Sequence, residues 1–146
     1  MQVHIFNHQK ALSLHIPSVE GAARALVKFL NISCEEVGLY FVTKRKIGAL
    51  HRQFFNDPTP TDCITFPIDS SYLGDIFICP AIAKEYARDH NVDPLEETLL
   101  YLVHGILHLA GYDDIDPKER KIMRKMEKNC MHHLKIKGIS LGPLSH

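Results

Sequence analysis

Residues 93–114 read DPLEETLLYLVHGILHLAGYDD, and the rest of the chain can be arranged around this segment. Asp93, Pro94 and Glu96 form a helix-start pattern, because an acidic cap accepts free amide protons and proline suits the first helical position. Leucine, isoleucine and valine fill most of the next turns, and Gly111 can adopt the left-handed conformation that ends a helix. The segment therefore predicts a helix from residue 94 to about residue 110.

Two histidines in this predicted helix, His104 and His108, lie four residues apart. Side chains with this spacing point the same way one turn apart, so both imidazoles can reach one metal ion. The chain then turns at Gly111 and can bring the Asp114 carboxylate back as a third ligand. The pattern H-x-x-x-H-x-x-G-x-x-[H/D] has the layout of the metzincin zinc peptidases. Three protein ligands leave a fourth position for water, so we expect one Zn2+ ion per chain at a catalytic-type site.

The histidine pair by itself has a second interpretation, as two core residues whose ring nitrogens are hydrogen-bonded. The helix-ending glycine and the correctly spaced carboxylate favour the metal site. In H-E-x-x-H zinc peptidases, the glutamate after the first histidine is the general base. Gly105 occupies that position here, which argues against a peptidase. Zinc can still polarise a phosphoryl oxygen, which suits phosphodiester hydrolysis.

The segments around this helix alternate between strand and helix patterns. Asp116, Pro117 and Glu119 repeat the helix-start arrangement and predict a last helix to about residue 137. The tail after Gly138 is expected to be loosely ordered. Apolar runs predict strands at residues 3–6, continued over 11–16, and at 37–42, 63–68 and 73–79. Helices are expected at about 17–30, from residue 44, and at about 80–91. Residues 56–62 are expected to form a loop.

This order of segments predicts one α+β domain over residues 1–146, with a small mixed β-sheet and about five helices packed against it. The length of 146 residues is that of an ordinary single domain. The four cysteines show no C-x-x-C pair and no disulfide spacing, so we expect free thiols in a reducing compartment. The chain shows no signal-peptide pattern and no apolar run of membrane-spanning length, which favours a cytoplasmic protein without a membrane partner.

The formal net charge is zero, but the charges are unevenly distributed. Residues 116–137 carry eight Lys or Arg and three Asp or Glu, so this predicted helix is strongly basic. Such a helix can bind a polyanion or can simply be a solvated surface helix. Lys44, Arg45 and Lys46 also start a predicted helix, where the macrodipole disfavours cations. This placement is a hint that the three charges serve something other than helix stability, and they become candidates for contacting the phosphates of RNA with the resemblance described next.

Three segments together resemble the bacterial YbeY-type endoribonucleases, which are rRNA maturation factors. HGILHLAGYDD at 104–114 resembles the family signature H-G-x-L-H-L-x-G-Y-D-H. PTDCITFP at 60–67 is similar to P-T-D-V-L-S-F-P, and LGDIFI at 73–78 is similar to L-G-D-I-x-I. The order, the spacing and the chain length agree, so the resemblance covers essentially the whole chain. It implies a mixed-sheet α+β fold, one zinc ion, cleavage of single-stranded RNA, and roles in 16S rRNA 3′-end maturation and ribosome quality control.

Two positions depart from the family pattern. Asp114 stands where the family has a histidine, which preserves a zinc ligand but lowers the positive charge of the site by one unit. Phe55 stands where the family segment L-N-x-x-Y-R has an arginine that the resemblance associates with catalysis. Arg52 lies three residues earlier on the same helical face, and it is either a catalytic substitute or a solvated surface residue.

The sequence therefore predicts a zinc-dependent, single-strand-specific endoribonuclease, a metal-dependent hydrolase that acts on the 16S rRNA precursor and the ribosomal small subunit. His104, His108 and Asp114 are the expected metal ligands, and Asp113 is a candidate for supporting them through a neighbouring contact. Arg52 is the candidate catalytic residue. The alternative is a non-catalytic zinc-containing ribosome-assembly factor, which the phenylalanine at position 55 favours.

Overall fold

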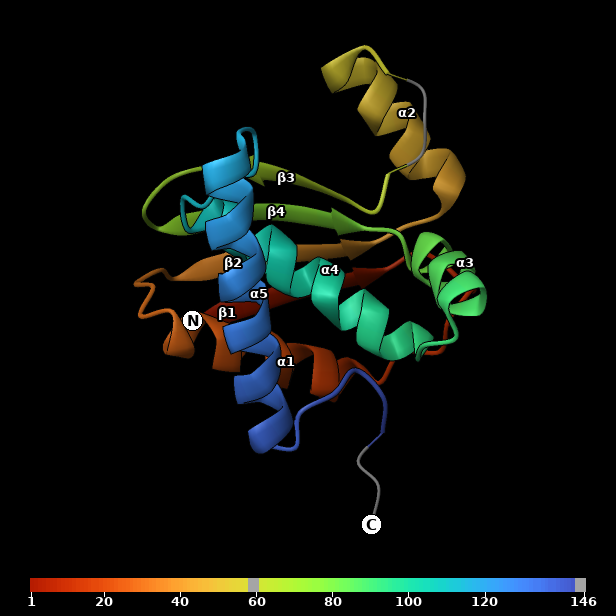
Figure 1. Ribbon diagram of the computed structural model, residues 1–146. Helices are drawn as coiled ribbons and strands as arrows, with labels where there is room; N and C mark the ends of the chain where they lie inside the picture. Colours follow the sequence, from red (N-terminus) through yellow and green to blue (C-terminus); the bar gives the residue numbers. More distant parts are fainter. Residues whose placement is uncertain (58–60, 144–146) are drawn as a thin grey trace.

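The computed structural model describes residues 1–57 and 61–143. Within these ranges, strands and helices follow one another in the predicted order, and the predicted α+β fold with a mixed sheet and five helices is confirmed (Figure 1). The strands are β1 (Gln2–Asn7), β2 (Glu36–Phe41), β3 (Cys63–Pro67) and β4 (Tyr72–Ile78). The helices are α1 (Ile16–Phe29), α2 (Lys44–Phe55), α3 (Pro80–His90), α4 (Pro94–Leu109) and α5 (Pro117–Ile136).

The four strands form one sheet in the order β1-β2-β4-β3. β1 pairs with β2 and β2 with β4 in parallel, whereas β3 runs antiparallel to β4. The single antiparallel pair arises because only the short turn at residues 68–71 joins β3 to β4, and parallel strands need a longer crossover. β1 and β3 are therefore the two edges of the sheet, and α2 stands beside the β3 edge (Figure 1).

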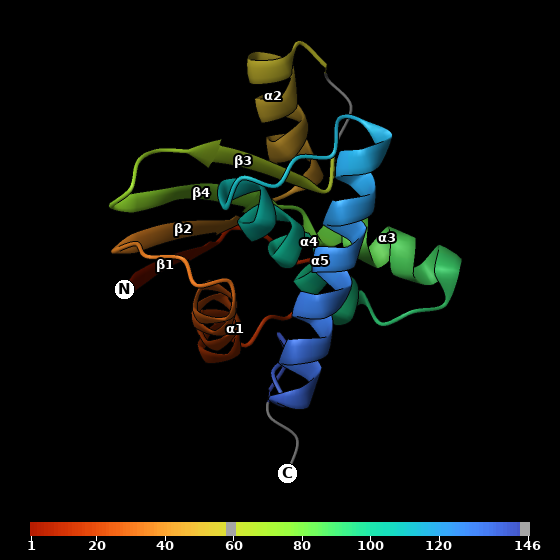
Figure 2. The same ribbon diagram turned by 60° about the vertical axis from the view of Figure 1, so that its left-hand side comes forward.

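The main hydrophobic core lies between one face of the sheet and the helices α1, α4 and α5, which Figures 1 and 2 show on the same side. α4 lies at its centre, and eight of its 16 residues are buried because its apolar residues surround much of the helix. The fully buried core members include Leu26 on α1, Leu39 on β2, Ile76 on β4, Leu102 on α4 and Leu134 on α5.

A smaller core occupies the opposite face of the sheet under α2. Successive strand residues point to opposite faces. Ile76 on β4 therefore joins the main core, while its neighbour Phe77 packs against the smaller one. Ile64 on β3 and Ile47 on α2 complete this second cluster with Val42. α2 is thus held against the β3 edge by apolar burial.

The contact between α4 and the sheet depends on Gly105. A Cβ atom placed there would lie 2.6 Å from Ile76 Cγ2 and 3.1 Å from Cys63 Sγ. Contacts below 3.0 Å force neighbouring atoms to move, and Ile76 is fully buried. The helix therefore approaches β3 and β4 more closely than any side chain at position 105 would permit. A glutamate base of the H-E-x-x-H type has no room here, which gives a packing reason against the peptidase interpretation.

Both ends of α4 form as expected from the sequence. The Asp93 carboxylate accepts a hydrogen bond from the Leu95 amide at 2.9 Å, and Pro94 occupies the first helical turn. At the other end, Gly111 has a φ of +103°. The Tyr112 amide then donates to the Leu107 carbonyl at 3.0 Å, which closes the last turn.

Two expectations from the sequence are wrong. Residues 11–15 are not a strand, and β1 ends at Asn7. The segment after Gly138 is not loose throughout, because Leu141 is fully buried in the main core. Its carbonyl accepts a hydrogen bond from the His15 amide at 3.0 Å, and the Gly142 carbonyl accepts one from the Ser18 hydroxyl at 2.9 Å. The residues 58–60 of the expected loop and 144–146 of the tail lie outside the described residues.

Other properties of the described residues agree with the sequence. Cys34, Cys63, Cys79 and Cys130 are all free thiols, and the last two are buried. In residues 1–57 and 61–143, no helix combines the length and the apolar composition that a membrane crossing requires.

The packing at Gly105 can be tested by comparing two glycine-to-alanine changes. Gly21 lies inside α1, and a Cβ there would meet no atom within 4 Å. Gly21→Ala is expected to stabilise the protein by about 0.5–1 kcal/mol because alanine favours helix. Gly105→Ala gains the same propensity but overpacks the core, so it should be less stable than Gly21→Ala by about 1–3 kcal/mol. Urea unfolding of both variants measures this difference, and equal stabilities would show that α4 can move away from the sheet freely.

Candidate metal centre

Three side chains from the end of α4 and the turn after it converge on one point. His104 and His108 lie one helical turn apart with their Nε2 atoms 3.0 Å from each other. The turn at Gly111 brings Asp114 back, so that its two carboxylate oxygens lie 3.5 Å from His104 Nε2 and 3.7 Å from His108 Nε2. The three potential ligand atoms lie within 4.8 Å of one another. The sequence spacing therefore places these side chains as a group that can hold a metal ion.

The separations within this group fit a tetrahedral metal site. Metal–nitrogen and metal–oxygen distances near 2.0–2.2 Å at tetrahedral angles give ligand atoms about 3.3–3.6 Å apart. The two histidine nitrogens are 3.0 Å apart, and they lie 3.5 and 3.7 Å from the two different oxygens of Asp114, which is close to that spacing. The side chains are 18%, 22% and 32% exposed, so the group is open to solvent on one side. Three ligands with one accessible side leave room for a water molecule or a substrate oxygen.

A buried carboxylate on α5 supports His104 from behind. Glu127 Oε2 lies 2.5 Å from His104 Nδ1, and its side chain is only 6% exposed. A carboxylate at this distance accepts the Nδ1 proton, which leaves the Nε2 lone pair directed toward Asp114 and His108. Arg124 Nη1 donates to both oxygens of Glu127, at 2.5 and 2.7 Å. Burial raises the pKa of Glu127, but the hydrogen bonds from His104 and Arg124 outweigh burial and hold that pKa below its usual value.

Sequence reasoning missed Glu127, although the sequence contains a signal for it. The buried positions of α5 are Met123, Glu127, Cys130 and Leu134, which recur at helical spacing. An acidic residue on this otherwise apolar stripe needs a partner, because an unpaired buried carboxylate is costly. The many cations of the segment obscure this pattern, since the net charge of the helix is dominated by its exposed face.

The metal group opens into a cleft of about 270 Å³ between α2, β3 and α4. His51 and Phe55 line it from α2, and Thr61 and Thr65 line it near and along β3. Cys63 also borders the cleft, but burial raises the pKa of its thiol far above the usual range. Among the described residues, the group that can hold a metal ion consists of His104, His108 and Asp114, so the donor set is two imidazoles and one carboxylate.

The other candidate residues lie around this cleft in different situations. Asp113 Oδ1 lies 3.8 Å from His108 Nδ1, beyond hydrogen-bonding distance, and its side chain is 62% exposed. Arg52 is exposed on α2, and it is not among the residues that line the cleft. Lys44 is bonded to Glu85 of α3 at 2.6 Å, whereas Arg45 and Lys46 are exposed. The metal group and Phe55 are therefore brought together, and the cations lie further along α2.

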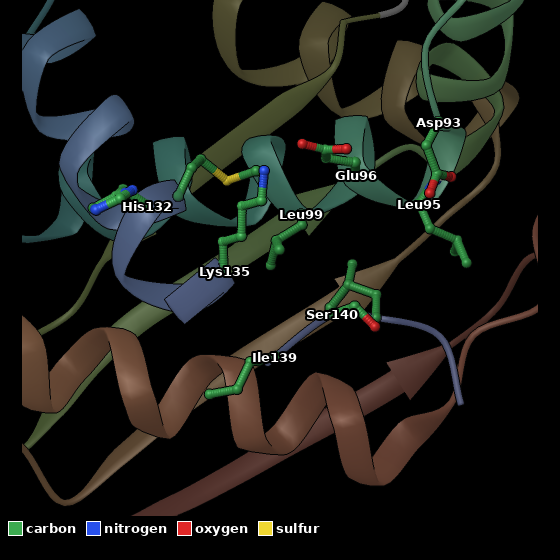
Figure 3. Close-up of a pocket in the computed structure, with 10 residues that line it drawn as sticks. Asp93, Leu95, Glu96, Leu99, His132, Lys135, Ile139 and Ser140 are labelled. Atoms are coloured by element: carbon green, nitrogen blue, oxygen red, sulfur yellow. The ribbon is translucent and has the colours of Figure 1, made fainter. Parts of the chain in front are cut away.

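A larger cavity lies at the opposite end of α4 and is drawn in Figure 3. It measures about 350 Å³, and its lining includes Leu95, Leu99, Lys135 and Ile139. Leu95 precedes His104 by nine residues, which is about 14 Å along the helix axis. The Asp93 carboxylate at its rim is engaged in capping α4. This cavity therefore has no part in the metal group.

Comparisons with known proteins agree with these features. Residues 4–135 match the family model described as "Endoribonuclease YbeY". The chain is 46% identical to "Endoribonuclease YbeY" of Protochlamydia amoebophila, over 88% of this chain and 90% of that protein. It is 34% identical to the protein of the same name from Chlamydia pneumoniae, over 94% of this chain and 93% of that one.

A solved structure has the same fold. The solution structure of protein TM1509 from Thermotoga maritima superposes with a TM-score of 0.68. The two sequences are 29% identical, and the match covers 93% of this chain and 91% of the other. The likeness extends over nearly the whole of both chains, so it includes the strands and helices that position the metal group.

The contact between Glu127 and His104 predicts a measurable effect on metal binding. Glu127→Gln keeps the size of the side chain but removes the charge that fixes the His104 tautomer. Loss of such a supporting carboxylate typically lowers metal affinity about 10–100-fold. Competition with a chromophoric chelator measures the affinity, and Glu20→Gln, which changes an exposed ion pair on α1, is the control. Equal affinities for both variants would show that His104 needs no partner on α5.

Proposed function

Because this chain belongs to the endoribonuclease YbeY family, whose members act in rRNA processing, we propose that it cleaves single-stranded RNA at a zinc centre. The observation that carries the proposal is the convergence of His104, His108 and Asp114 at separations that suit a tetrahedral ion. Two imidazole nitrogens and one carboxylate oxygen form a donor set that zinc accepts readily. The open side of the group faces the cleft in which RNA would lie.

Each residue of the centre then has a defined task. His104 and His108 hold the ion through Nε2, and Glu127 keeps His104 in the tautomer that leaves this atom free. Asp114 supplies the third ligand and one negative charge. When bound, zinc would make a water molecule more acidic and draw electron density from the scissile phosphate. Asp113 is close enough to His108 to support it after a small side-chain rotation.

The biological substrate we propose is the precursor of 16S rRNA, bound to or near the ribosomal small subunit. The proposed tasks are maturation of its 3′ end and ribosome quality control. The support is membership of the family, together with a cleft of about 270 Å³, which suits part of an extended strand better than a duplex. Arg52 is proposed to contact RNA from α2 rather than to act at the metal, because it lies outside the lining of the cleft.

Incubation of zinc-loaded protein with labelled single-stranded rRNA tests the proposal directly. Cleavage should stop when a chelator removes the metal and return when zinc is added. RNA binding without cleavage, at any zinc concentration, would favour a non-catalytic zinc-containing assembly factor. The observation that favours this second function is Phe55, whose side chain cannot donate a hydrogen bond to a phosphate.

The charge of the third ligand should control the pH dependence of cleavage. Asp114→Ala removes the ligand and should abolish both zinc binding and cleavage. Asp114→His replaces a carboxylate with a neutral imidazole, which makes the loaded centre one unit more positive. The pH at which cleavage is half-maximal should therefore fall, and activity near neutrality should rise. Rate measurements from about pH 5 to about pH 9 on the wild type and on Asp114→His check this expectation. Identical pH–rate profiles would show that ionisation of the metal-bound water does not limit the rate of cleavage.

The exposed cations at the start of α2 should contribute to RNA binding. Arg45→Glu combined with Lys46→Glu removes two phosphate contacts, and each contact to a single strand accounts for about 0.7 units of the slope of log K against log salt. The slope should flatten by about 1.4 units. Lys28→Glu with Lys137→Glu, exposed on α1 and after α5, changes the net charge equally and serves as the control. If both pairs of substitutions flatten the slope equally, RNA binding depends only on the net charge of the protein and not on Arg45 and Lys46.

A further inference from the structure

Two adjacent phenylalanines at the end of α2 are equally exposed but lie in different surroundings. Phe54 and Phe55 each retain 55% of their accessible surface. The ring of Phe54 packs edge-on against Phe66 of β3, with 4.9 Å between centroids, and Phe66 packs in turn against Phe77 at 5.7 Å. Phe54 therefore belongs to an aromatic cluster over the smaller core, which accounts for its presence.

Phe55 has no such role in packing. It lines the metal cleft together with His104 and His108, and the aromatic contact recorded for it in the described residues is with His51. That contact is tilted by 49° with 5.4 Å between centroids. Because Phe55 is 55% exposed and lines the cleft, part of its ring is accessible to a ligand. An aromatic ring exposed at a cleft offers a flat apolar face on which a planar ligand group can stack.

Two arginines on the same side of α2 as Phe55 indicate a phosphate-bearing partner. Arg52 precedes Phe55 by three residues, and Arg45 precedes Arg52 by seven, so helical spacing brings the three side chains to one side of α2. Both arginines are exposed, and within residues 1–57 and 61–143 neither side chain makes a hydrogen bond or an ion pair. Lys44 differs from them because Glu85 neutralises it. Arg52 lies about one helical turn from Phe55, and Arg45 lies about 15 Å away along the same side of the helix. An aromatic ring with arginines on the same side of the helix offers contacts to a base and to phosphates further along the strand.

We propose that Phe55 stacks on a base of the single-stranded RNA substrate beside the metal centre, and that this contact sets the preference for unpaired nucleotides. The inference rests on the proposed nuclease function and specifies how its substrate is held. Single-stranded bases expose both faces and stack readily on aromatic side chains, whereas a duplex hides these faces. An arginine at this position would attract the phosphates of single-stranded and duplex RNA alike. Phenylalanine gives no such attraction but binds an unpaired base selectively.

The test measures the Kd of a 2′-O-methyl oligonucleotide, which resists cleavage, for the zinc-loaded wild type and for zinc-loaded variants. Stacking on one aromatic ring contributes about 1–3 kcal/mol per base, so Phe55→Ala should raise Kd about 5–150-fold. Phe55→Trp should restore binding, because it offers a larger ring. Phe54→Ala is the matched control with the same exposure. It should leave Kd within about twofold while lowering the melting temperature, because it removes a packing contact.

A second measurement separates stacking from a structural effect. One abasic site is moved along the oligonucleotide, and at one position it should weaken binding to the wild type but not to Phe55→Ala. Equal Kd values for wild type and Phe55→Ala, or an abasic penalty that survives in Phe55→Ala at every position, would overturn the proposal. If wild-type protein binds RNA with these properties but shows no zinc-dependent cleavage, the nuclease proposal fails and the stacking contact stands. If cleavage depends on zinc but not on Phe55, only the stacking proposal fails.

Discussion

The close approach of α4 to the sheet at Gly105 is the constraint on which the metal group depends. Without a side chain at this position, the helix lies directly on Ile76 and Cys63. His104 and His108 are consequently held at the β3 edge, where the cleft under α2 begins. The same packing excludes a glutamate after the first histidine. The fold therefore leaves no place for the general base that H-E-x-x-H peptidases carry at this position.

A second constraint is electrostatic and links α5 to the metal group. Glu127 is a carboxylate in the main core, and its burial is tolerated because His104 and Arg124 both donate to it. Removing either donor would leave a buried charge with fewer partners, so α5 and α4 are coupled through this side chain. The basic character of α5 thus has two components. Arg124 compensates Glu127, whereas most of the remaining cations of the helix are exposed to solvent.

Local signals in the sequence predicted the helices and strands well, because several helices begin or end at a residue with a specific backbone role. Asp93 and Asp116 cap helices, and Gly111 ends one. The errors came from segments whose conformation depends on distant contacts. Residues 11–15 alternate like a strand, but in the described part of the chain no strand lies beyond the β1 edge to pair with them. Leu141 belongs to the segment that was expected to be loosely ordered, and only the fold shows the core position that it fills.

The candidate site shows the same division between local and distant information. His104, His108 and Asp114 lie within a single short segment, so helix geometry alone predicted that they could converge. Glu127 and Phe55 reach the site from α5 and α2, and only the packing of these helices reveals their contacts. Each of the two departures from the family pattern, Asp114 and Phe55, removes one unit of positive charge from the region where a phosphate would lie.

This loss of charge changes how RNA would be held in the proposed complex. Attraction to phosphates weakens as salt rises, because bound counterions are released on association. Stacking on an aromatic ring depends little on salt and requires an exposed base face. With Asp114 and Phe55 in place, a larger share of the binding free energy comes from the base and a smaller share from its phosphate. Arg45 and Arg52, set back along α2, then supply long-range attraction without adding charge at the metal. In the proposed complex, the site would therefore distinguish an unpaired nucleotide from other polyanions by the shape of its base.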